Sequence, residues 1–312
     1  MLSGAGHRTR LWGPSDEEMK RLREAGHPPG VPELHLPEEV ETGTDLPRML
    51  SGAEAAVFAI PSQAIEETCR RMASLGSAPP LLVVASKGMD LRSLRPLSEV
   101  IAEQLPECRI TVISGPCIAK EVARGIPTSV VAACSDPSAA GRVQRWFASP
   151  TFRVYRQGDV LGVELGGALK NVIAIAAGIS DGLGFGANSK SALLTRGLAE
   201  ITRFACALGA EERTIAGLAG LGDLCVTCFS PHSRNRRFGE ALGRGRSPEE
   251  ALQEIGETVE GVPTARAVVT KARQLSIPVP VAEAVARILE GEWTPGEAVE
   301  RLMTRELKEE FS

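Results

Sequence analysis

The 312-residue sequence lacks several features that would place it in a specialised class of protein. Its 35 basic and 39 acidic residues give a formal net charge of −4, which offers no electrostatic footprint for nucleic acid or an anionic membrane. No apolar run approaches the roughly 20 residues that a membrane span needs, and the first residues lack the apolar core of a signal peptide. The sequence therefore predicts a globular cytoplasmic protein with no nucleic-acid partner and no membrane span.

The sequence is also poor in candidate metal ligands. Its seven cysteines are odd in number and scattered, which fits a reducing compartment better than a disulfide framework. Cys225 and Cys228 have C-x-x-C spacing, but there is no second such pair and the four histidines are dispersed. Both a metal or redox role and a pair of packed thiols are open for these cysteines, and the surrounding pattern predicts no metal site.

The first half of the chain alternates short apolar runs with helical stretches, a pattern that indicates βα units and a mostly parallel sheet. The expected strands are His7–Trp12, Ala55–Ile60, Leu81–Ser86, Thr111–Ser114 and Thr128–Ala133. The expected helices are Gln63–Ala73, Leu94–Leu105 and Ser138–Phe147. Several of these strands end directly in turn residues, and open α/β sheets bind ligands at the carboxyl ends of their strands.

From Gly158 onward the pattern changes to long stretches of helical period with no convincing strand. We therefore expect two domains, an α/β domain over residues 1–157 and an all-α domain over residues 158–312. Within the second domain, Ser247 and Thr294 each stand before a proline and three residues before a glutamate, which predicts two capped helix starts.

Lys170 is a lone cation in the apolar stretch Val163–Ile175. A lysine in this position is either a reactive amine whose pKa is lowered by burial, or a side chain whose stem packs while its head reaches water. Gly166 and Gly167 precede it by four and three residues and so share its helical face. Because glycine has no side chain, we expect space beside the amine in which a ligand could dock.

A second constellation lies downstream, around Ser233. This serine is expected to cap a helix from about Asn235 to Leu242, so that backbone N–H groups and the Arg234 guanidinium converge as a phosphate monoester requires. An ordinary capped surface helix with solvated arginines is the alternative. Asp223 could orient a lysine or cap a loop. Lys87, after the expected strand Leu81–Ser86, adds a cation at the carboxyl edge of the sheet.

These residues stand in a series of motifs through which the chain resembles bacterial-type NAD(P)-dependent glycerol-3-phosphate dehydrogenases. The series keeps the family's order and spacing and covers nearly the whole chain from His7 to the last helix. Its main members are Ser86-Lys87-Gly88, Ile113-Ser114-Gly115-Pro116, Gly125-Ile126-Pro127-Thr128, Val163-Glu164-Leu165-Gly166-Gly167-Ala168-Leu169-Lys170-Asn171, Asp181-Gly182-Leu183-Gly184-Phe185-Gly186, Gly220-Leu221-Gly222-Asp223-Leu224, Ser233-Arg234-Asn235 and Val259-Glu260-Gly261.

The resemblance implies a Rossmann-like domain followed by an all-α domain. It also implies reduction of dihydroxyacetone phosphate to sn-glycerol 3-phosphate, the entry to phospholipid backbones, with hydride from NADH or NADPH. By the same resemblance Lys170 gives and takes the substrate proton, while Arg234 and Asn235 hold the phosphate. Further substrate contacts fall to Lys87, Gly115, Asp223 and Ser233, with Asn171 and Thr227 as neighbours. Cofactor contacts fall to Lys87, Ala119, Arg234 and Glu260.

The chain departs from the family at its beginning. A family member opens with a strand and a glycine-rich turn that cradles the pyrophosphate. Gly4-Ala5-Gly6 is not that turn, because Gly6–Trp12 matches the family's second strand. We therefore expect the first βα unit, on the order of 20 residues, to be missing, and apolar surface on the neighbouring strands to be exposed. Asp16 also stands near the position where the family tends to place an arginine, and would repel an adenosine 2′-phosphate.

Two explanations of this departure remain open. The true start lies upstream of a truncated gene model, or the chain is a fragment or diverged relative that no longer binds dinucleotide normally. The leading function is the dehydrogenase. The alternatives are a non-catalytic binder of a glycerol-phosphate-like ligand and a two-domain reductase of another small acid or ketone. The sequence does not settle the choice of NAD or NADP, or the oligomeric state, for which a homodimer is one option.

Overall fold

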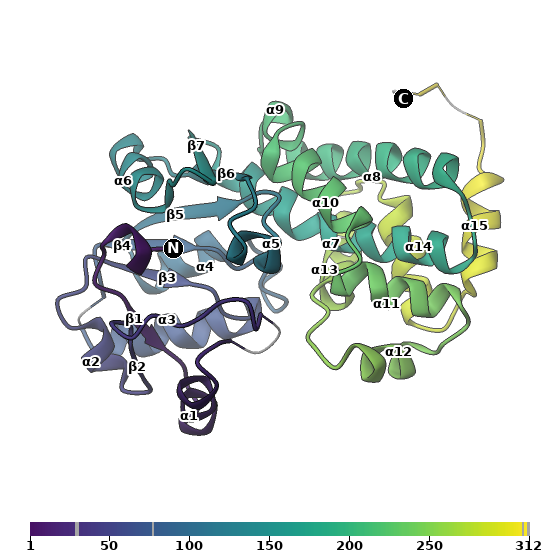
Figure 1. Cartoon of the computed structure of the whole chain (residues 1–312). Helices are drawn as coiled ribbons and strands as arrows, with labels where there is room; N and C mark the ends of the chain where they lie inside the picture. Colours follow the sequence, from purple (N-terminus) through teal and green to yellow (C-terminus); the bar gives the residue numbers. More distant parts are fainter. Residues whose placement is uncertain (29–30, 77, 308, 311–312) are drawn as a thin grey trace. The chain divides into compact units, whose positions relative to one another are not determined.

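The structure, a computed structural model, describes residues 1–28, 31–76, 78–307 and 309–310. The chain divides into two compact units, one formed by residues 1–90 and 95–164 and the other by residues 91–94 and 165–312 (Figure 1). The unit boundary falls inside the long helix α7 (Val160–Gly182), a few residues after the boundary expected from the sequence pattern. The periodicity changes where the last strand ends, whereas the first turns of α7 still belong to the first unit.

The first unit contains a five-stranded sheet of order β3-β4-β5-β6-β7 and a separate parallel pair, β1-β2. All neighbouring strands in the larger sheet are parallel except β5 and β6, so the expected mostly parallel sheet is confirmed. The strands are β1 (Arg10–Trp12), β2 (Glu41–Gly43), β3 (Ala55–Phe58), β4 (Leu81–Val84), β5 (Arg109–Ser114), β6 (Thr128–Ala133) and β7 (Phe152–Gln157).

Two of these strands, β2 and β7, were not expected. In β2 the sequence Glu-Thr-Gly shows no alternation of apolar and polar residues. This strand forms by pairing with β1, a tertiary contact that the local sequence does not predict. In β7 a usable signal is present, because buried Phe152 and Val154 alternate with exposed Arg153 and Tyr155.

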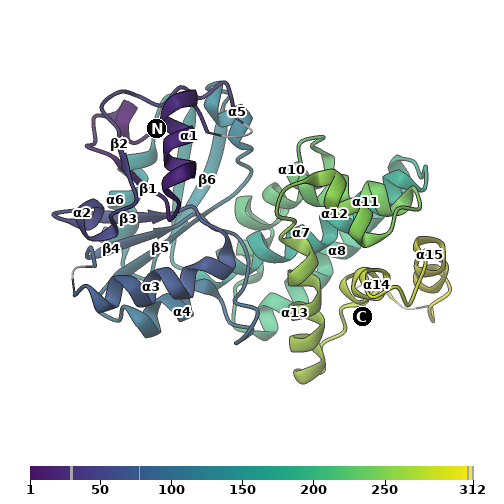
Figure 2. The same ribbon diagram turned by 90° about the horizontal axis from the view of Figure 1, so that it is seen from below.

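The helices of the first unit connect its strands (Figure 2). They are α1 (Asp16–Ala25), α2 (Leu46–Leu50), α3 (Ile65–Ser74), α4 (Leu97–Gln104), α5 (Ala119–Ala123) and α6 (Pro137–Phe147), with short 3-10 turns η1 (Ser3–Ala5) and η2 (Ser62–Ala64). Helix α4 begins three residues later than expected from the pattern. The cause is Pro96, which disfavours helical geometry at Arg95 and itself stands at the cap of the helix.

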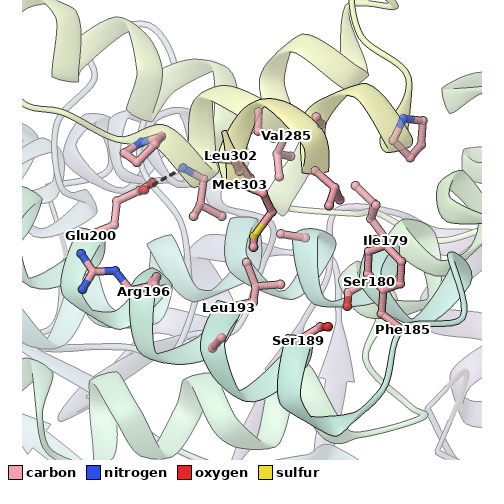
Figure 3. Close-up of a pocket in the computed structure, with 18 of the residues that line it drawn as sticks. Ile179, Ser180, Phe185, Ser189, Leu193, Arg196, Glu200, Val285, Leu302 and Met303 are labelled. Atoms are coloured by element: carbon pink, nitrogen blue, oxygen red, sulfur yellow. Dashed lines mark hydrogen bonds between the residues drawn. The ribbon is translucent and has the colours of Figure 1, made fainter. Parts of the chain in front are cut away.

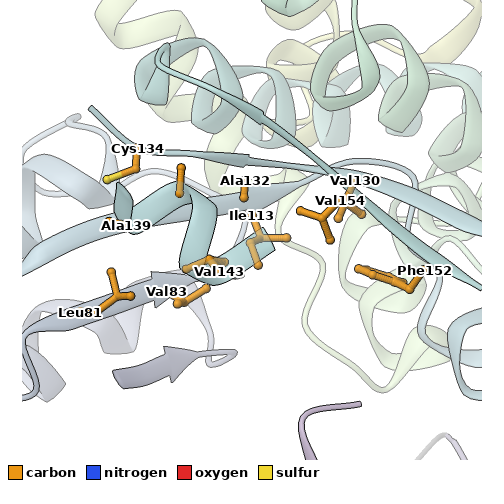
Figure 4. Close-up of a cluster of buried hydrophobic side chains, with 11 residues drawn as sticks. Leu81, Val83, Ile113, Val130, Ala132, Cys134, Ala139, Val143, Phe152 and Val154 are labelled. Carbon is orange, nitrogen blue, oxygen red and sulfur yellow. The ribbon is translucent and has the colours of Figure 1, made fainter. Parts of the chain in front are cut away.

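Strand β4 lies at the centre of the core, since each of its four residues is at most 1% exposed. Leu81 and Val83 belong to a hydrophobic cluster with Ala139 and Val143 of α6 (Figure 4). Successive side chains of a strand point to opposite faces, so Leu82 and Val84 are buried on the other face of the sheet. A strand covered on both faces reads as a continuous apolar run, which is how the sequence revealed it.

The pair β1-β2 shares no hydrogen-bonded ladder with the larger sheet in the described residues. An apolar side chain is exposed on a strand of each sheet, Leu11 on β1 and Val57 on β3. Among the residues that the structure describes, strand β3 is the end strand of the larger sheet and pairs with β4 alone.

The second unit is helical, and none of its described residues forms a strand, as the sequence pattern predicted. Besides α7 it contains α8 (Ala187–Ala207), α9 (Glu212–Ile215), the π-helical turn η3 (Leu218–Gly222), α10 (Asp223–Phe229), α11 (Arg234–Gly243), α12 (Pro248–Ile255), α13 (Gly261–Gln274), α14 (Pro280–Leu289) and α15 (Pro295–Met303). The two expected capped starts are confirmed, because Ser247 and Thr294 each form a complete capping box.

Helix α7 corrects one expectation about apolar runs. It has 23 residues and a mean hydropathy of 1.6 in its most apolar window, so by length and composition alone it could cross a membrane. In the structure, however, 83% of that window is buried, as in the core helix of a soluble protein. A helix that is apolar on most of its surface is typical of the interior of a large protein.

Candidate active site

Lys170 lies on α7 and is only 5% exposed. Its ammonium group donates hydrogen bonds to the carboxylate of Asp223 and, at 2.8 Å, to the hydroxyl oxygen of Thr227. Asp223 is itself 1% exposed. The interpretation in which the lysine head reaches water is therefore wrong, and the cation is held in a buried ion pair.

The partners of Lys170 come from consecutive turns of one short helix, α10. Asp223 and Thr227 are four residues apart and so share a helical face. The Thr227 hydroxyl donates its proton to the Asp223 carbonyl oxygen at 2.6 Å, which leaves its oxygen to accept from the lysine. Of the two roles open for Asp223, the geometry supports orientation of a lysine, since its carboxylate is bonded to the ammonium group.

Gly166 does not provide the ligand space expected beside Lys170. A Cβ atom at this position would lie 2.8 Å from the carbonyl oxygen of Ala219 and 3.2 Å from the Cα atom of Gly220. The backbone of the turn η3 therefore fills this place. The expectation failed because glycine spacing cannot distinguish room for a ligand from room for another segment of the chain. Here it lets η3 pack closely on α7 and deliver Asp223 to the lysine.

The next residue along α7, Asn171, begins a second polar contact. The side-chain amide of Asn235 donates to the Asn171 side-chain oxygen at 3.0 Å, and its own oxygen accepts from the Gly261 backbone N–H at 2.8 Å. A Cβ atom at Gly261 would approach both Asn171 and Asn235 to 2.7 Å, so the close fit requires glycine. Asn235 thus ties the starts of α11 and α13 to the middle of α7.

Helix α11 begins at Arg234, one residue before the expected start, and Ser233 is its cap. The Ser233 hydroxyl accepts from the backbone N–H of Arg236 at 3.2 Å, which confirms the predicted capping. The Arg234 side chain is 44% exposed and lies 3.7 Å from the carboxylate of Glu257. The first turn of this helix therefore presents a guanidinium group together with backbone N–H groups, the combination that binds oxyanions.

The position of α11 is set by glycines that were not assigned any role from the sequence. A Cβ atom at Gly178 of α7 would lie 2.0 Å from the Arg236 carbonyl oxygen, and one at Gly239 of α11 would lie 2.0 Å from the Ile175 carbonyl oxygen. The two backbones are thus in direct contact. A detectable signal exists, because Gly178 and Gly182 on α7, like Gly239 and Gly243 on α11, are spaced by four residues.

Asp181 is a further residue that sequence reasoning quoted only as part of a motif. Its carboxylate accepts from the Arg236 guanidinium and from the Lys190 ammonium, each at 2.7 Å. These side chains are largely buried and join α7, α8 and α11. The cluster fixes the first turn of α11 from the side opposite to its exposed arginine, Arg234.

The remaining candidates lie in the first unit. The Lys87 ammonium, which follows β4, donates to the Gly115 carbonyl oxygen at 3.1 Å and contacts the Cys117 sulfur at 3.6 Å. Gly115 follows β5 and has φ +143°, and a Cβ atom there would lie 3.0 Å from the Val130 Cα atom. Ala119 begins α5. These residues therefore gather at the carboxyl ends of two neighbouring parallel strands, as expected.

Glu260 lies at the start of α13, where its carbonyl oxygen accepts from the Thr264 hydroxyl at 2.7 Å. Cys225 and Cys228 are free thiols on α10. Burial raises the pKa of Cys228 to about 12 and that of Cys225 above its usual value, which supports packed thiols for this pair. Within the described part of the chain, no group of three His, Cys, Asp or Glu side chains could hold a metal ion.

Comparison with known proteins connects both units to one family. The models of the NAD-dependent glycerol-3-phosphate dehydrogenase N-terminus and C-terminus match residues 1–140 and 159–300. The chain is 46% identical to the glycerol-3-phosphate dehydrogenase [NAD(P)+] of Thioalkalivibrio sulfidiphilus, with 99% of this chain and 94% of the relative covered. It is 45% identical to that of Pelotomaculum thermopropionicum, with coverages of 98% and 88%. The crystal structure of glycerol-3-phosphate dehydrogenase from Coxiella burnetii superposes with a TM-score of 0.92 at 38% identity, covering 97% of this chain and 94% of that one.

Proposed function

Because the chain belongs to the NAD-dependent glycerol-3-phosphate dehydrogenase family, we propose that it interconverts dihydroxyacetone phosphate and sn-glycerol 3-phosphate with NADH or NADPH. The observation that carries this proposal is the buried Lys170–Asp223 ion pair with Thr227, which holds an amine in a fixed place inside the helical unit. Synthesis of glycerophospholipid precursors in the cytoplasm is the role that fits this reaction.

When bound, NADH or NADPH would supply the hydride that reduces the ketone carbon. Negative charge then develops on the substrate oxygen, and Lys170 donates the proton that converts it to the alcohol. In the oxidative direction the neutral amine of Lys170 accepts that proton. Asp223 and Thr227 keep the amine in one orientation and compensate the removal of its charge from water.

The phosphate of the substrate is assigned to the start of α11. Arg234 offers a guanidinium group that remains partly exposed and is only loosely paired with Glu257. Ser233 and Asn235 flank it, and the dipole of the helix adds positive potential at the same end. An ionised phosphate ester would accept from both the guanidinium fork and the backbone N–H groups. Asn171 supports this site through its bond to Asn235.

We assign residues of this chain to contacts with the dinucleotide cofactor, but we assign none to its pyrophosphate. Gly115 brings backbone close to β6 at a strand end where Lys87 adds a cation, an arrangement suited to a polar cofactor group. We propose that Lys87, Ala119, Arg234 and Glu260 contact the dinucleotide, and that Lys87 and Gly115 also contact substrate. We assign no residue of the sequence to the pyrophosphate, because we expect the family's glycine-rich turn to be missing from it.

The strand arrangement suggests where that turn would belong. In a doubly wound sheet the first strand lies between the second strand and the strand that follows the crossover. Here the corresponding neighbours are β1 and β3, which share no ladder in the described part of the chain and which carry the exposed Leu11 and Val57. We therefore propose that the first βα unit is the element this sequence lacks, and that its strand would lie between β1 and β3.

A direct assay of cofactor oxidation tests the function. The purified protein is mixed with dihydroxyacetone phosphate and NADH or NADPH, and oxidation of the cofactor is followed by absorbance. Lys170→Ala is expected to remove turnover, whereas Arg234→Ala is expected to raise KM for the phosphorylated substrate about tenfold or more. Arg266→Ala, which changes an exposed arginine on α13, is the control and should change neither.

Other outcomes separate the alternatives. Calorimetric binding of glycerol 3-phosphate without binding of either dinucleotide, and without turnover, would identify a non-catalytic binder. Full substrate affinity in Arg234→Ala would point to a reductase whose substrate carries no phosphate. Sedimentation equilibrium would establish whether the protein forms the homodimer that the sequence leaves open.

A further inference from the structure

The second unit contains an apolar cavity that includes none of the residues assigned above (Figure 3). Helices α7, α8, α14 and α15 form its walls, and its volume is about 450 Å³. Ile179, Leu193, Val285, Leu302 and Met303 supply most of the apolar lining. Small-molecule sites in proteins have volumes of roughly 300–1,000 Å³ and are mostly apolar with a few polar groups, so the cavity has the size and character of a ligand site.

One polar group in the cavity has no partner. Ser180 of α7 is 7% exposed, and its hydroxyl oxygen makes no hydrogen bond with any described residue. Buried hydroxyl groups are almost always hydrogen-bonded, because an unsatisfied one costs about 1–3 kcal/mol. Ser180 lines the cavity together with Ser189 of α8. A ligand oxygen that accepts from Ser180 would satisfy this group.

The other end of the cavity carries charge. In Figure 3, Arg196 and Glu200 lie at one end and Ile179 and Ser180 at the other, with Leu193 and Met303 in between. The carboxylate of Glu200 is already committed, because it accepts from the backbone N–H groups of Val281 and Ala282 at 2.7 and 2.8 Å.

The charged lining residues are positive in sum. Arg203 and Arg305 line the cavity along with Arg196, and both act electrostatically on Glu200. Arg196 donates to the Glu310 carbonyl oxygen at 2.8 Å and Arg203 donates to the Pro278 carbonyl oxygen at 2.9 Å, and neither of these acceptors carries the charge of a carboxylate. The cavity lining thus holds three guanidinium groups and one carboxylate, which caps a helix. This end of the cavity therefore favours an anionic group over a neutral or cationic one.

From these three features we propose that the cavity binds a medium-chain aliphatic carboxylate that carries an oxygen at its far end. The carboxylate lies toward Arg196, the chain lies along Leu193, Leu302 and Met303, and the far oxygen accepts from Ser180. Binding at this site is separate from the chemistry of Lys170. It can therefore be measured whether or not the protein reduces dihydroxyacetone phosphate.

Calorimetry on the full chain with three matched probes tests the proposal. 10-Hydroxydecanoate carries both polar ends, decanoate lacks the far hydroxyl, and 1,10-decanediol lacks the carboxylate. We expect 10-hydroxydecanoate to bind with one site per chain, and each of the other two to bind about tenfold more weakly. In Ser180→Ala, decanoate and 10-hydroxydecanoate should bind equally. In Arg196→Ala, the preference for the carboxylate over the diol should shrink.

A blocking variant locates the binding. Ala192 is an exposed residue of α8 that lines the cavity, so Ala192→Trp fills the space without burying a new group in the core. It should abolish binding of 10-hydroxydecanoate. Ala187→Trp makes the same change at an exposed position of the same helix outside the lining, and should leave binding intact. Absence of saturable binding by any probe, or binding that Ala192→Trp leaves unchanged, would overturn the proposal.

Discussion

The ammonium group of Lys170 and the carboxylate of Asp223 form an ion pair in which the side chains are only 6% and 1% exposed. Neither charge could be buried alone without a large desolvation cost. Two requirements therefore meet at the same residues. The helical unit cannot lose one of the two charges alone without a large loss of stability, and the proposed reaction needs the amine.

Comparison of a single and a double replacement in this ion pair should distinguish its effect on stability from its effect on activity. Lys170→Met removes the ammonium group that compensates the buried Asp223 carboxylate, so we expect the free energy of unfolding to fall by about 3–5 kcal/mol. Lys170→Met/Asp223→Leu removes both charges and should recover more than half of that loss, although both variants remain inactive. Urea unfolding and the cofactor assay measure the two effects, and Lys20→Met, at a side chain 70% exposed, is the control. Equal stability of the single and double variants would contradict the prediction.

The amide of Asn235 should matter to substrate affinity as well as to packing. Asn235→Ala removes two hydrogen bonds and leaves the buried N–H of Gly261 without its acceptor, which should destabilise the protein by about 2 kcal/mol. Because Asn235 stands beside Arg234, KM for dihydroxyacetone phosphate should rise more than KM for the cofactor. Asn188→Ala, at an exposed position, serves as control. A change in stability with unaltered KM would limit Asn235 to packing.

The contact between α7 and α11 should tolerate no side chain. Gly239→Ala places a methyl group 2.0 Å from the Ile175 carbonyl oxygen, a backbone atom that cannot move alone. We expect a loss of about 3 kcal/mol or more in unfolding free energy, with loss of substrate binding as α11 shifts. Gly296→Ala is the matched control, since a methyl group there meets no atom within 4 Å and lies in the first turn of α15. Thermal unfolding compares the two variants.

Two buried carboxylates make the stability depend on pH. Burial raises the pKa of Glu164 to about 7 and that of Glu200 to about 7, from the ordinary 4.5. The folded state therefore holds protons that the unfolded state releases. The corresponding stability is fully present below pH 4.5 and is lost as the pH rises through about 7. The unfolding free energy should fall by an amount on the order of a few kcal/mol across this range.

Replacement of Glu164 tests how much of this pH dependence of stability comes from its carboxyl group. Glu164 accepts from the backbone N–H of Ser98 at 2.9 Å and from its hydroxyl group, and so caps α4. Glu164→Gln cannot titrate and should flatten the pH profile of urea unfolding. Glu249→Gln, at an exposed position of α12, should leave the slope unchanged. An identical slope in wild type and Glu164→Gln would show that Glu164 does not titrate in this range.

Asp16 should bias the choice of cofactor toward NADH. It begins α1 just after β1, and its carboxylate accepts a hydrogen bond from the Thr44 hydroxyl. A carboxylate at the carboxyl end of this strand can accept from ribose hydroxyls but repels a 2′-phosphate. Asp16→Asn should raise kcat/KM for NADPH relative to NADH by about tenfold, whereas Glu17→Gln on the exposed face of α1 should not. An unchanged ratio would remove Asp16 from cofactor selection.

Much of the fold could be predicted from local pattern. The apolar run of β4, the capped starts at Ser247 and Thr294, and the cap at Ser233 all follow from interactions within a few residues. Strand β2 could not be predicted, because its three residues gain their conformation from pairing with β1. The sequence pattern likewise predicted that Lys170 lies in an apolar helix and that Arg234 lies near a helix start.

The sequence by itself determined which residues are available for chemistry and which helices present them. Only the tertiary structure decided what each of them contacts. Gly166 and Gly167 predicted space for a ligand, but the backbone of η3 fills the space beside Gly166. A glycine leaves room equally for a ligand or for another segment of the chain. Lys170 could have reached water, but η3 and α10 bring Asp223 to it instead. Pairing of residues 53 positions apart depends on how helices pack, and no local pattern encodes that distance.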